Sequence, residues 1–407
     1  MSTGAVPWFH VLKEPWGAVL ALGILWLGIQ FSTLGPLTPI LVSQGGGLDK
    51  AQVVLFFVIL VVTGIGTTLA TGYLSDGRVP RFLLILVFGL LGAVGNAGLA
   101  AGGPPCWYYL FGALSSCGFV LFSQFFAVAQ AGVMGNWLPH TRVLGTTVLR
   151  TIYSLGFILG TGLASFLLLW VELRVLFWTM AASGVTLAVV SAALVARLET
   201  KVPATQAISE GHPPHPSAPT SSVWTSLAAL ALPLWALALL QGADRARGVY
   251  LPLVTFHLYH DPRWAPMLFG TTAAFELVTM ILLGSVAIRF GERWTIVTGA
   301  LVGAACFASM AVFPSLPMLF LANVVYSIFN AVLFGVAMAY VQGMVAHRPG
   351  LGNSLFVLTM NLGALVGIFA PAVLPGYSPT IFFLPGGLCL AGALLMGERV
   401  KIRGLQR

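Results

Sequence analysis

The sequence predicts an all-α membrane protein with twelve transmembrane helices in two six-helix bundles around a central cavity. Composition, the spacing of apolar runs and an internal repeat predict this fold. Of 407 residues, 58% are hydrophobic and 7% are charged, whereas soluble domains contain about 25% charged residues. A membrane β-barrel would show short segments of alternating hydrophobicity. Here the apolar runs are continuous and long enough, at about 20 residues, to span a membrane as helices.

The apolar runs mark the predicted spans in chain order. The first run is too long for a signal-peptide core and lacks a clear cleavage site, so we interpret it as a retained span. A polar stretch rich in proline, serine and threonine follows the sixth run and predicts a flexible linker. The predicted domains are therefore an N-terminal bundle (1–198), a cytoplasmic linker (199–222) and a C-terminal bundle (223–407). The predicted spans are 16–42, 51–74, 81–102, 106–132, 143–170, 174–196, 224–256, 265–288, 294–313, 317–345, 351–374 and 379–397.

The distribution of basic residues predicts the orientation. With the N-terminus in the cytoplasm, thirteen of the 19 Lys and Arg residues fall at cytoplasmic ends of spans and three at outer ends. The other three, Arg150, Arg245 and Arg247, fall inside spans. Cytoplasmic loops of membrane proteins are enriched in Lys and Arg. We therefore expect both termini in the cytoplasm and the protein in the inner membrane of a bacterium. The net charge of +8 reflects this loop bias and does not indicate nucleic-acid binding.

The two halves of the chain repeat. His140, Leu144, Gly145, Leu155, Gly156 and Gly160 recur 207 positions later as His347, Leu351, Gly352, Leu362, Gly363 and Gly367. A second echo, offset by 212, relates the loop at 72–81 to the loop at 284–293. Two six-helix halves in parallel repeat are the architecture of the major facilitator superfamily, whose fold we therefore expect.

The loop after the second span resembles the signature of that superfamily. It reads Gly-Tyr-Leu-Ser-Asp-Gly-Arg-Val-Pro-Arg over 72–81. An acidic residue at a helix end facing loop arginines can form a charge clamp that closes one side of the protein in one state. The alternative is an ordinary loop whose arginines only set orientation. The residues predicted to gate the conformational change are Gly72, Asp76, Arg78, Arg81, Arg289 and Arg293.

Further segments resemble one family, the bacterial sugar efflux transporters. They include Ala-Ala-Phe-Glu-Leu-Val-Thr over 273–279 and Phe-Asn-Ala over 329–331. The segments around Gln124 and Arg150, and Tyr-Leu-Pro-Leu over 250–253, are also similar to that family. The resemblance covers most of the chain. It implies a secondary active transporter, an antiporter that exports sugars or similar small polar solutes by alternating access.

Three charges interrupt the seventh apolar run. Asp244, Arg245 and Arg247 lie between Gln241 and Tyr250, and a charge at mid-membrane costs about 2.5–3.5 kcal/mol. If the span begins at 224 and has 20 residues, it ends at 243 and the charges lie at the outer membrane face. If the helix is longer, they face the cavity. The resemblance favours the longer helix.

Glu276 is a carboxyl group near the middle of the eighth span. Proton coupling requires a carboxyl group that can both gain and lose its proton, and Asp244 is a second candidate. The alternative is permanent pairing, of Glu276 with either Arg245 or Arg247, and of Asp244 with its neighbouring arginines. Arg150 either faces the cavity or extends to the cytoplasmic surface. The residues predicted to couple protons are Asp244, Glu276 and Arg150.

Amide side chains inside spans can bind sugar hydroxyl groups, because each amide both donates and accepts hydrogen bonds. The alternative for each is a hydrogen bond between helices. The residues predicted to bind substrate are Gln30, Gln124, Asp244, Arg245, Arg247, Asn330 and Asn361.

Other activities lack their residues. The sequence contains no GxxxxGK[ST] nucleotide-binding loop and no HExxH or GxSxG motif, so we expect no enzyme, no cofactor and no metal. We expect a monomer whose partners are a small-molecule substrate, protons and the lipid bilayer. Efflux of drugs or organic anions remains the alternative function. A receptor or scaffold is disfavoured, because the longest polar stretch is the short linker.

Overall fold

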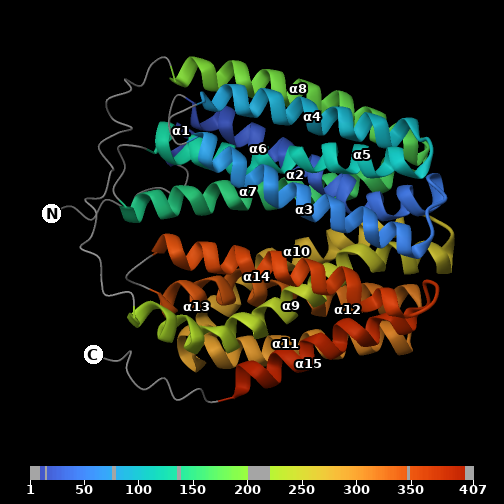
Figure 1. Cartoon of the computed structure of the whole chain (residues 1–407), viewed down its shortest axis with the longest axis vertical. Coiled ribbons are helices and arrows are strands. Elements are labelled where there is room, and N and C mark those ends of the chain that lie inside the picture. The colour runs from blue at the N-terminus through green and yellow to red at the C-terminus, as the bar shows by residue number, and fades with distance from the viewer. Residues whose placement is uncertain are drawn as a thin grey trace. The chain divides into compact units, whose positions relative to one another are not determined.

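The structure, a computed structural model, describes residues 10–13, 16–75, 79–134, 139–199, 221–345 and 349–398. These residues form helices joined by short turns and contain no strand, which confirms the predicted all-α class (Figure 1). They fall into two compact units. Unit 1 comprises the described residues up to 199 together with 262–270, and unit 2 comprises 221–261 and 271–398.

The helices of unit 1 follow the predicted spans closely. The first and fourth spans are each built from consecutive helical segments that include a π-helical turn. The segments are α1 (His10–Lys13), α2 (Gly17–Ile40), η1 (Leu41–Gly45), α3 (Lys50–Ser75), α4 (Arg81–Ala101), α5 (Pro105–Ser116), η2 (Cys117–Phe119), α6 (Val120–Val128), η3 (Ala129–Val133), α7 (Pro139–Leu167) and α8 (Leu173–Glu199).

Unit 2 repeats this organisation. Helix α10 begins in residues assigned to unit 1 and continues into unit 2. The segments are α9 (Ser221–Tyr259), α10 (Trp264–Phe290), α11 (Glu292–Val312), α12 (Leu316–Ala331), η5 (Val332–Val336), α13 (Ala337–Met344), α14 (Pro349–Phe369), η6 (Ala370–Val373), η7 (Pro379–Phe382) and α15 (Phe383–Gly397).

Ten of the predicted spans are helices long and apolar enough to cross a membrane within the described part of the chain. The other two are α9 and α10, with 39 and 27 residues. Both are longer than the roughly 20 residues that a span needs. They carry Asp244, Arg245, Arg247 and Glu276. The two helices that contain the most unusual charges are thus also long enough to span a membrane.

The internal repeat is visible in the helix pairing. In unit 1, α2 packs along α7 and α4 along α8; in unit 2, α9 packs along α14 and α11 along α15. The pair of α4 and α8 can be followed in Figure 1. Repeated glycines lie at the contacts. A Cβ on Gly160 of α7 would lie 2.5 Å from the Ile29 carbonyl oxygen of α2, and one on Gly363 of α14 would lie 2.5 Å from the Ala238 carbonyl oxygen of α9. Glycine at both positions allows the backbones to approach closely.

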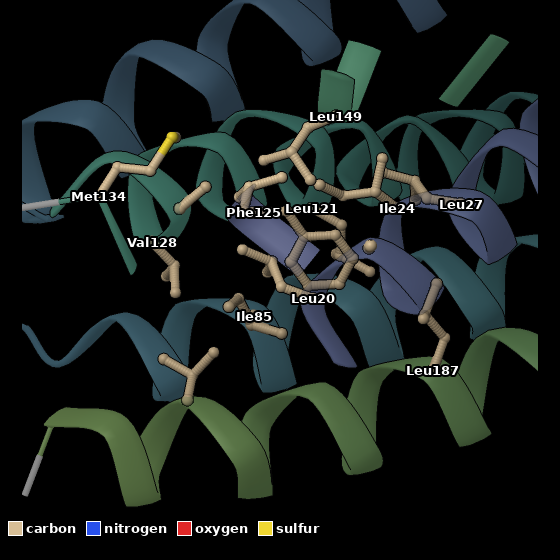
Figure 2. Close-up of a cluster of buried hydrophobic side chains, with 14 of the residues drawn as sticks. Leu20, Ile24, Leu27, Ile85, Leu121, Phe125, Val128, Met134, Leu149 and Leu187 are labelled. Carbon is tan, nitrogen blue, oxygen red and sulfur yellow. The ribbon is translucent and has the colours of Figure 1, made fainter. Parts of the chain in front are cut away.

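The core of unit 1 is a cluster of aliphatic and aromatic side chains from several helices (Figure 2). Leu20 and Ile24 of α2 meet Leu121 and Phe125 of α6, with Ile85 of α4 beside them. Each is less than a tenth exposed. Lipid is as apolar as these side chains, so close packing, more than exclusion from water, stabilises such a cluster in a membrane.

Candidate functional site

Arg247 lies at the centre of a polar cluster in unit 2. Its side chain is only 3% exposed. Nη2 donates a hydrogen bond of 2.7 Å to the Thr272 hydroxyl of α10, and Nε donates one of 3.2 Å to Oδ1 of Asn323 on α12. The guanidinium carbon lies 4.3 Å from the centre of the Tyr326 ring, a cation–π distance. A charge from α9 is thus held by groups of α10 and α12.

Two carboxyl groups lie in the same cluster. The Tyr326 hydroxyl donates a 2.8 Å hydrogen bond to Oδ1 of Asp244. The Asn330 amide donates one of 2.7 Å to Oε2 of Glu276. Both carboxyl side chains are half-buried. Each therefore accepts a hydrogen bond from a neutral donor on α12.

One face of α12 provides these contacts. Asn323, Tyr326 and Asn330 are spaced by three and four residues, which places them on the same side of a helix. The Thr272 hydroxyl also donates to Oδ1 of Asn323 at 3.1 Å, and the Thr279 hydroxyl donates to the Ser327 carbonyl at 3.3 Å. These bonds hold α10 and α12 in register, so that Glu276 and Asn330 meet.

The charged stretch lies well inside α9. The helix continues for 15 residues beyond Asp244, to Tyr259, or about 22 Å at 1.5 Å per residue. Within that stretch the Tyr250 hydroxyl donates a 2.8 Å hydrogen bond to the Ile368 carbonyl of α14. Helix α9 therefore does not end at Ala243. Arg247 is buried in unit 2, and Asp244 and Arg245 are half-buried.

Thr272 and Tyr326 are the functional candidates that sequence reasoning missed. Neither residue is charged or an amide, and both types are common in membrane helices. The available signal was the spacing of Tyr326 between Asn323 and Asn330 in an otherwise apolar segment.

In unit 1 the predicted binding residues do not form one cluster. Nε2 of Gln30 donates to the Ser183 hydroxyl at 3.0 Å and to the Met180 carbonyl at 3.3 Å, both on α8. Gln124 is 3% exposed, and its Oε1 is buried without a hydrogen-bond partner. Arg150, on α7, is exposed. Gln30 thus bonds to α8 through its amide nitrogen, whereas the carbonyl oxygen of Gln124 has no hydrogen-bond partner.

Comparison with known proteins shows what the chain is similar to. The family model described as Major Facilitator Superfamily matches residues 246–401, which include most of unit 2. The chain is 25% identical to Sugar efflux transporter A of Escherichia coli, over 94% of this chain and 96% of that protein. It is 27% identical to a putative sugar efflux transporter of Deinococcus radiodurans, over 93% and 97%. The C-terminal part of the chain is thus similar to the major facilitator superfamily, and the chain as a whole is similar to sugar efflux transporters.

The fold is similar to that of a solved transporter. The crystal structure of the nucleoside transporter NupG matches with a TM-score of 0.71 at 13% identity, over 93% of this chain and 98% of that chain. The chain is thus a multi-pass membrane protein and a secondary transporter of small molecules. These relatives and this structural neighbour are transporters.

The predicted gating residues that the structure describes lie near helix ends. Nη1 of Arg81 donates to the Ala127 carbonyl of α6 at 3.2 Å, at the start of α4. At the equivalent start of α11, Arg293 donates to the Met396 carbonyl at 2.6 Å and to the Glu398 carbonyl. Gly72 lies near the end of α3 and Arg289 is exposed near the end of α10. Asp76 and Arg78 lie outside the described residues. In both repeats, therefore, the arginine joins two helices of one unit.

Of the remaining predicted residues, Arg245 follows Asp244 on α9 and is half-buried, and Asn361 is half-buried on α14. The unit 2 cluster thus contains three of the predicted residues with charges, namely Asp244, Arg247 and Glu276, together with Asn330.

Proposed function

We propose that the protein is a proton-coupled transporter that exports sugars or similar small polar solutes by alternating access. The observation that supports this most is the unit 2 cluster, in which two half-buried carboxyl groups accept hydrogen bonds from neutral donors. A proton carrier has to be stable with and without its proton, and a neutral partner permits both forms. The sugar efflux transporters among the relatives support the substrate class.

The contacts of Arg247 support a neutral solute. A cation that binds an anionic solute has to be accessible to that solute. Arg247 is buried and already donates to Thr272 and Asn323 and stacks on Tyr326. We therefore infer that its charge maintains the cluster and does not bind cargo. Efflux of organic anions or drugs is accordingly not favoured.

Solute recognition would fall to neutral amides. Gln124 has a buried carbonyl oxygen without a donor, and a sugar hydroxyl group is a suitable donor. Asn330 and Asn361 are half-buried and would contribute from unit 2. Gln30 would contribute its remaining carbonyl oxygen. These assignments keep the four amides among the predicted substrate-binding residues. Arg247, which was predicted to bind substrate, instead holds the cluster together in this proposal.

We further propose the predicted orientation and domain division. Both termini lie in the cytoplasm, the protein resides in the inner membrane of a bacterium, and it works as a monomer. Residues 1–198 and 223–407 are the two bundles, joined by 199–222. The loops around Asp76 and Arg289 alternate between closed and open states.

Transport by the purified protein in liposomes tests this proposal. We would impose a pH gradient and measure uptake of labelled sugars, organic anions and cationic dyes in parallel. We expect gradient-driven movement of at least one sugar, and protein-free liposomes serve as the control. Transport of dyes or organic anions alone would refute the substrate class. Sugar movement that does not respond to the pH gradient would refute the coupling.

A further inference from the structure

We propose that the two carboxyl groups of the unit 2 cluster have different roles. Glu276 carries the transported proton. Asp244 remains ionised as the counter-charge of Arg247. Tyr326 positions Asp244 and Arg247 relative to each other. This inference rests on the proposed function, because it assigns the proton carrier within the proposed coupling site.

The contacts of Asp244 tie it to Arg247. The two residues lie three positions apart on α9, on neighbouring turns of one helix face. Tyr326 contacts both: its hydroxyl donates to Asp244 at 2.8 Å, and its ring lies 4.3 Å from the Arg247 guanidinium carbon. The hydrogen-bond partners of Arg247 on α10 and α12, Thr272 and Asn323, are neutral. Protonation of Asp244 would therefore remove negative charge beside a buried cation, which is strongly unfavourable.

The contacts of Glu276 leave it free to change state. Its hydrogen bond comes from the neutral amide of Asn330 at 2.7 Å. An amide N–H can donate to a carboxylate and equally to the carbonyl oxygen of a protonated carboxyl group. The charged groups near Glu276 are Asp244 and Arg247, both from α9 and of opposite sign. Loss of the Glu276 charge therefore leaves the pair of Asp244 and Arg247 intact.

The backbone beside Glu276 also differs from that beside Asp244. Asn330 is the next-to-last residue of α12, and the π-helical turn Val332–Val336 follows directly. Such turns interrupt the regular hydrogen-bond pattern and are frequent at functional sites. Tyr326, by contrast, lies within the regular part of α12. The donor to Glu276 is thus placed where the helix can rearrange when the proton binds.

The number of protons moved per solute distinguishes a carrier from a positioning residue. We would measure solute flux and the pH change together in liposomes, for the wild type and for Glu276→Gln, Asp244→Asn and Tyr326→Phe. We expect Glu276→Gln to move solute only by exchange, with proton movement at the level of protein-free liposomes. Tyr326→Phe keeps the ring and loses the hydroxyl, and should transport more slowly with an unchanged number of protons per solute. Asp244→Asn should also keep the number of protons per solute if the variant reaches the membrane. Glu292→Gln, at the start of α11, is the matched control.

The outcomes separate this inference from the proposed function. If wild-type protein moves solute without protons, the proposed coupling fails. If the wild type couples but Glu276→Gln keeps the normal ratio, the carrier assignment is wrong. If Tyr326→Phe or Asp244→Asn abolishes proton movement while solute exchange continues, Asp244 takes part in proton transfer and the division of roles is wrong. If Asp244→Asn does not fold, the Glu276→Gln and Tyr326→Phe results decide.

Discussion

Alanine at Gly160 should destabilise unit 1, whereas alanine two residues away should not. A Cβ at Gly160 would lie 2.5 Å from the carbonyl oxygen of Ile29 and 2.7 Å from its Cα, and would also overlap the Ser32 hydroxyl. The first two obstacles are backbone atoms of α2, so no side-chain rotation relieves them. Gly162, on the same helix, has no atom within 4 Å of its Cβ position.

The difference between the two variants isolates the packing cost. Each replacement of glycine by alanine inside a helix gains about 0.5–1 kcal/mol in helix propensity, so this gain cancels in the comparison. Forcing one extra carbon into a packed interface costs about 1–3 kcal/mol. We therefore expect Gly160→Ala to be less stable than Gly162→Ala by about 1–3 kcal/mol. For a unit of 150–250 residues, about 2–4 °C per kcal/mol gives a difference of about 2–12 °C in Tm.

Thermal unfolding in detergent measures this difference, with all variants scanned at one rate because membrane proteins often unfold irreversibly. Gly363→Ala provides the same test in unit 2, where a Cβ would lie 2.5 Å from the Ala238 carbonyl oxygen. If Gly160→Ala melts at the temperature of Gly162→Ala, α2 and α7 do not approach as closely as described. The repeated glycines would then need another explanation.

Three further variants or modifications test the site and the orientation. Arg247→Lys keeps the charge but loses the hydrogen bonds from Nε and Nη2 to Asn323 and the stacking on Tyr326. It should therefore lower Tm by the equivalent of about 1.5–3 kcal/mol. An unchanged Tm would show that the guanidinium does not hold the cluster together. Gln124→Leu removes a buried acceptor that has no hydrogen-bond donor. It should raise the free energy of unfolding by about 1–3 kcal/mol and also raise the KM for the solute. A normal KM would show that Gln124 does not bind the solute. A membrane-impermeant maleimide should label Cys106, the exposed cysteine, from outside intact cells, and labelling only after lysis would reverse the proposed orientation.

Much of the fold follows from local properties of the sequence. Hydropathy sets where each helix begins and ends, because a span needs about 20 apolar residues. The repeated glycines were also readable from the sequence, and Gly160 and Gly363 lie where two backbones come closest. A repeat of glycines at one offset reports helix contacts directly, because only a missing side chain permits so close an approach.

The contacts of the charged residues could not be read in the same way. Hydropathy places Asp244 and Glu276 along their helices, but their partners depend on how α12 is rotated relative to α9 and α10. That rotation is fixed by small contacts such as the Thr279 hydroxyl on the Ser327 carbonyl, 3.3 Å apart. Neither threonine nor serine is unusual in a membrane helix. For this reason Tyr326 was missed, although it contacts both Asp244 and Arg247.

The two repeats have diverged in chemistry while keeping the same helix packing. The first and fourth spans, which contain α2 and α6, correspond by position to α9 and α12. Helices α2 and α6 contain no charged residue, whereas α9 contributes Asp244, Arg245 and Arg247 to the cluster. A charged side chain inside a membrane is costly unless it is paired or hydrogen-bonded. Because only unit 2 has such stabilised charges on these helices, we infer that they serve a role that unit 1 lacks. We infer that unit 2 carries the proton chemistry, and that unit 1 contributes neutral groups such as Gln124 to solute recognition.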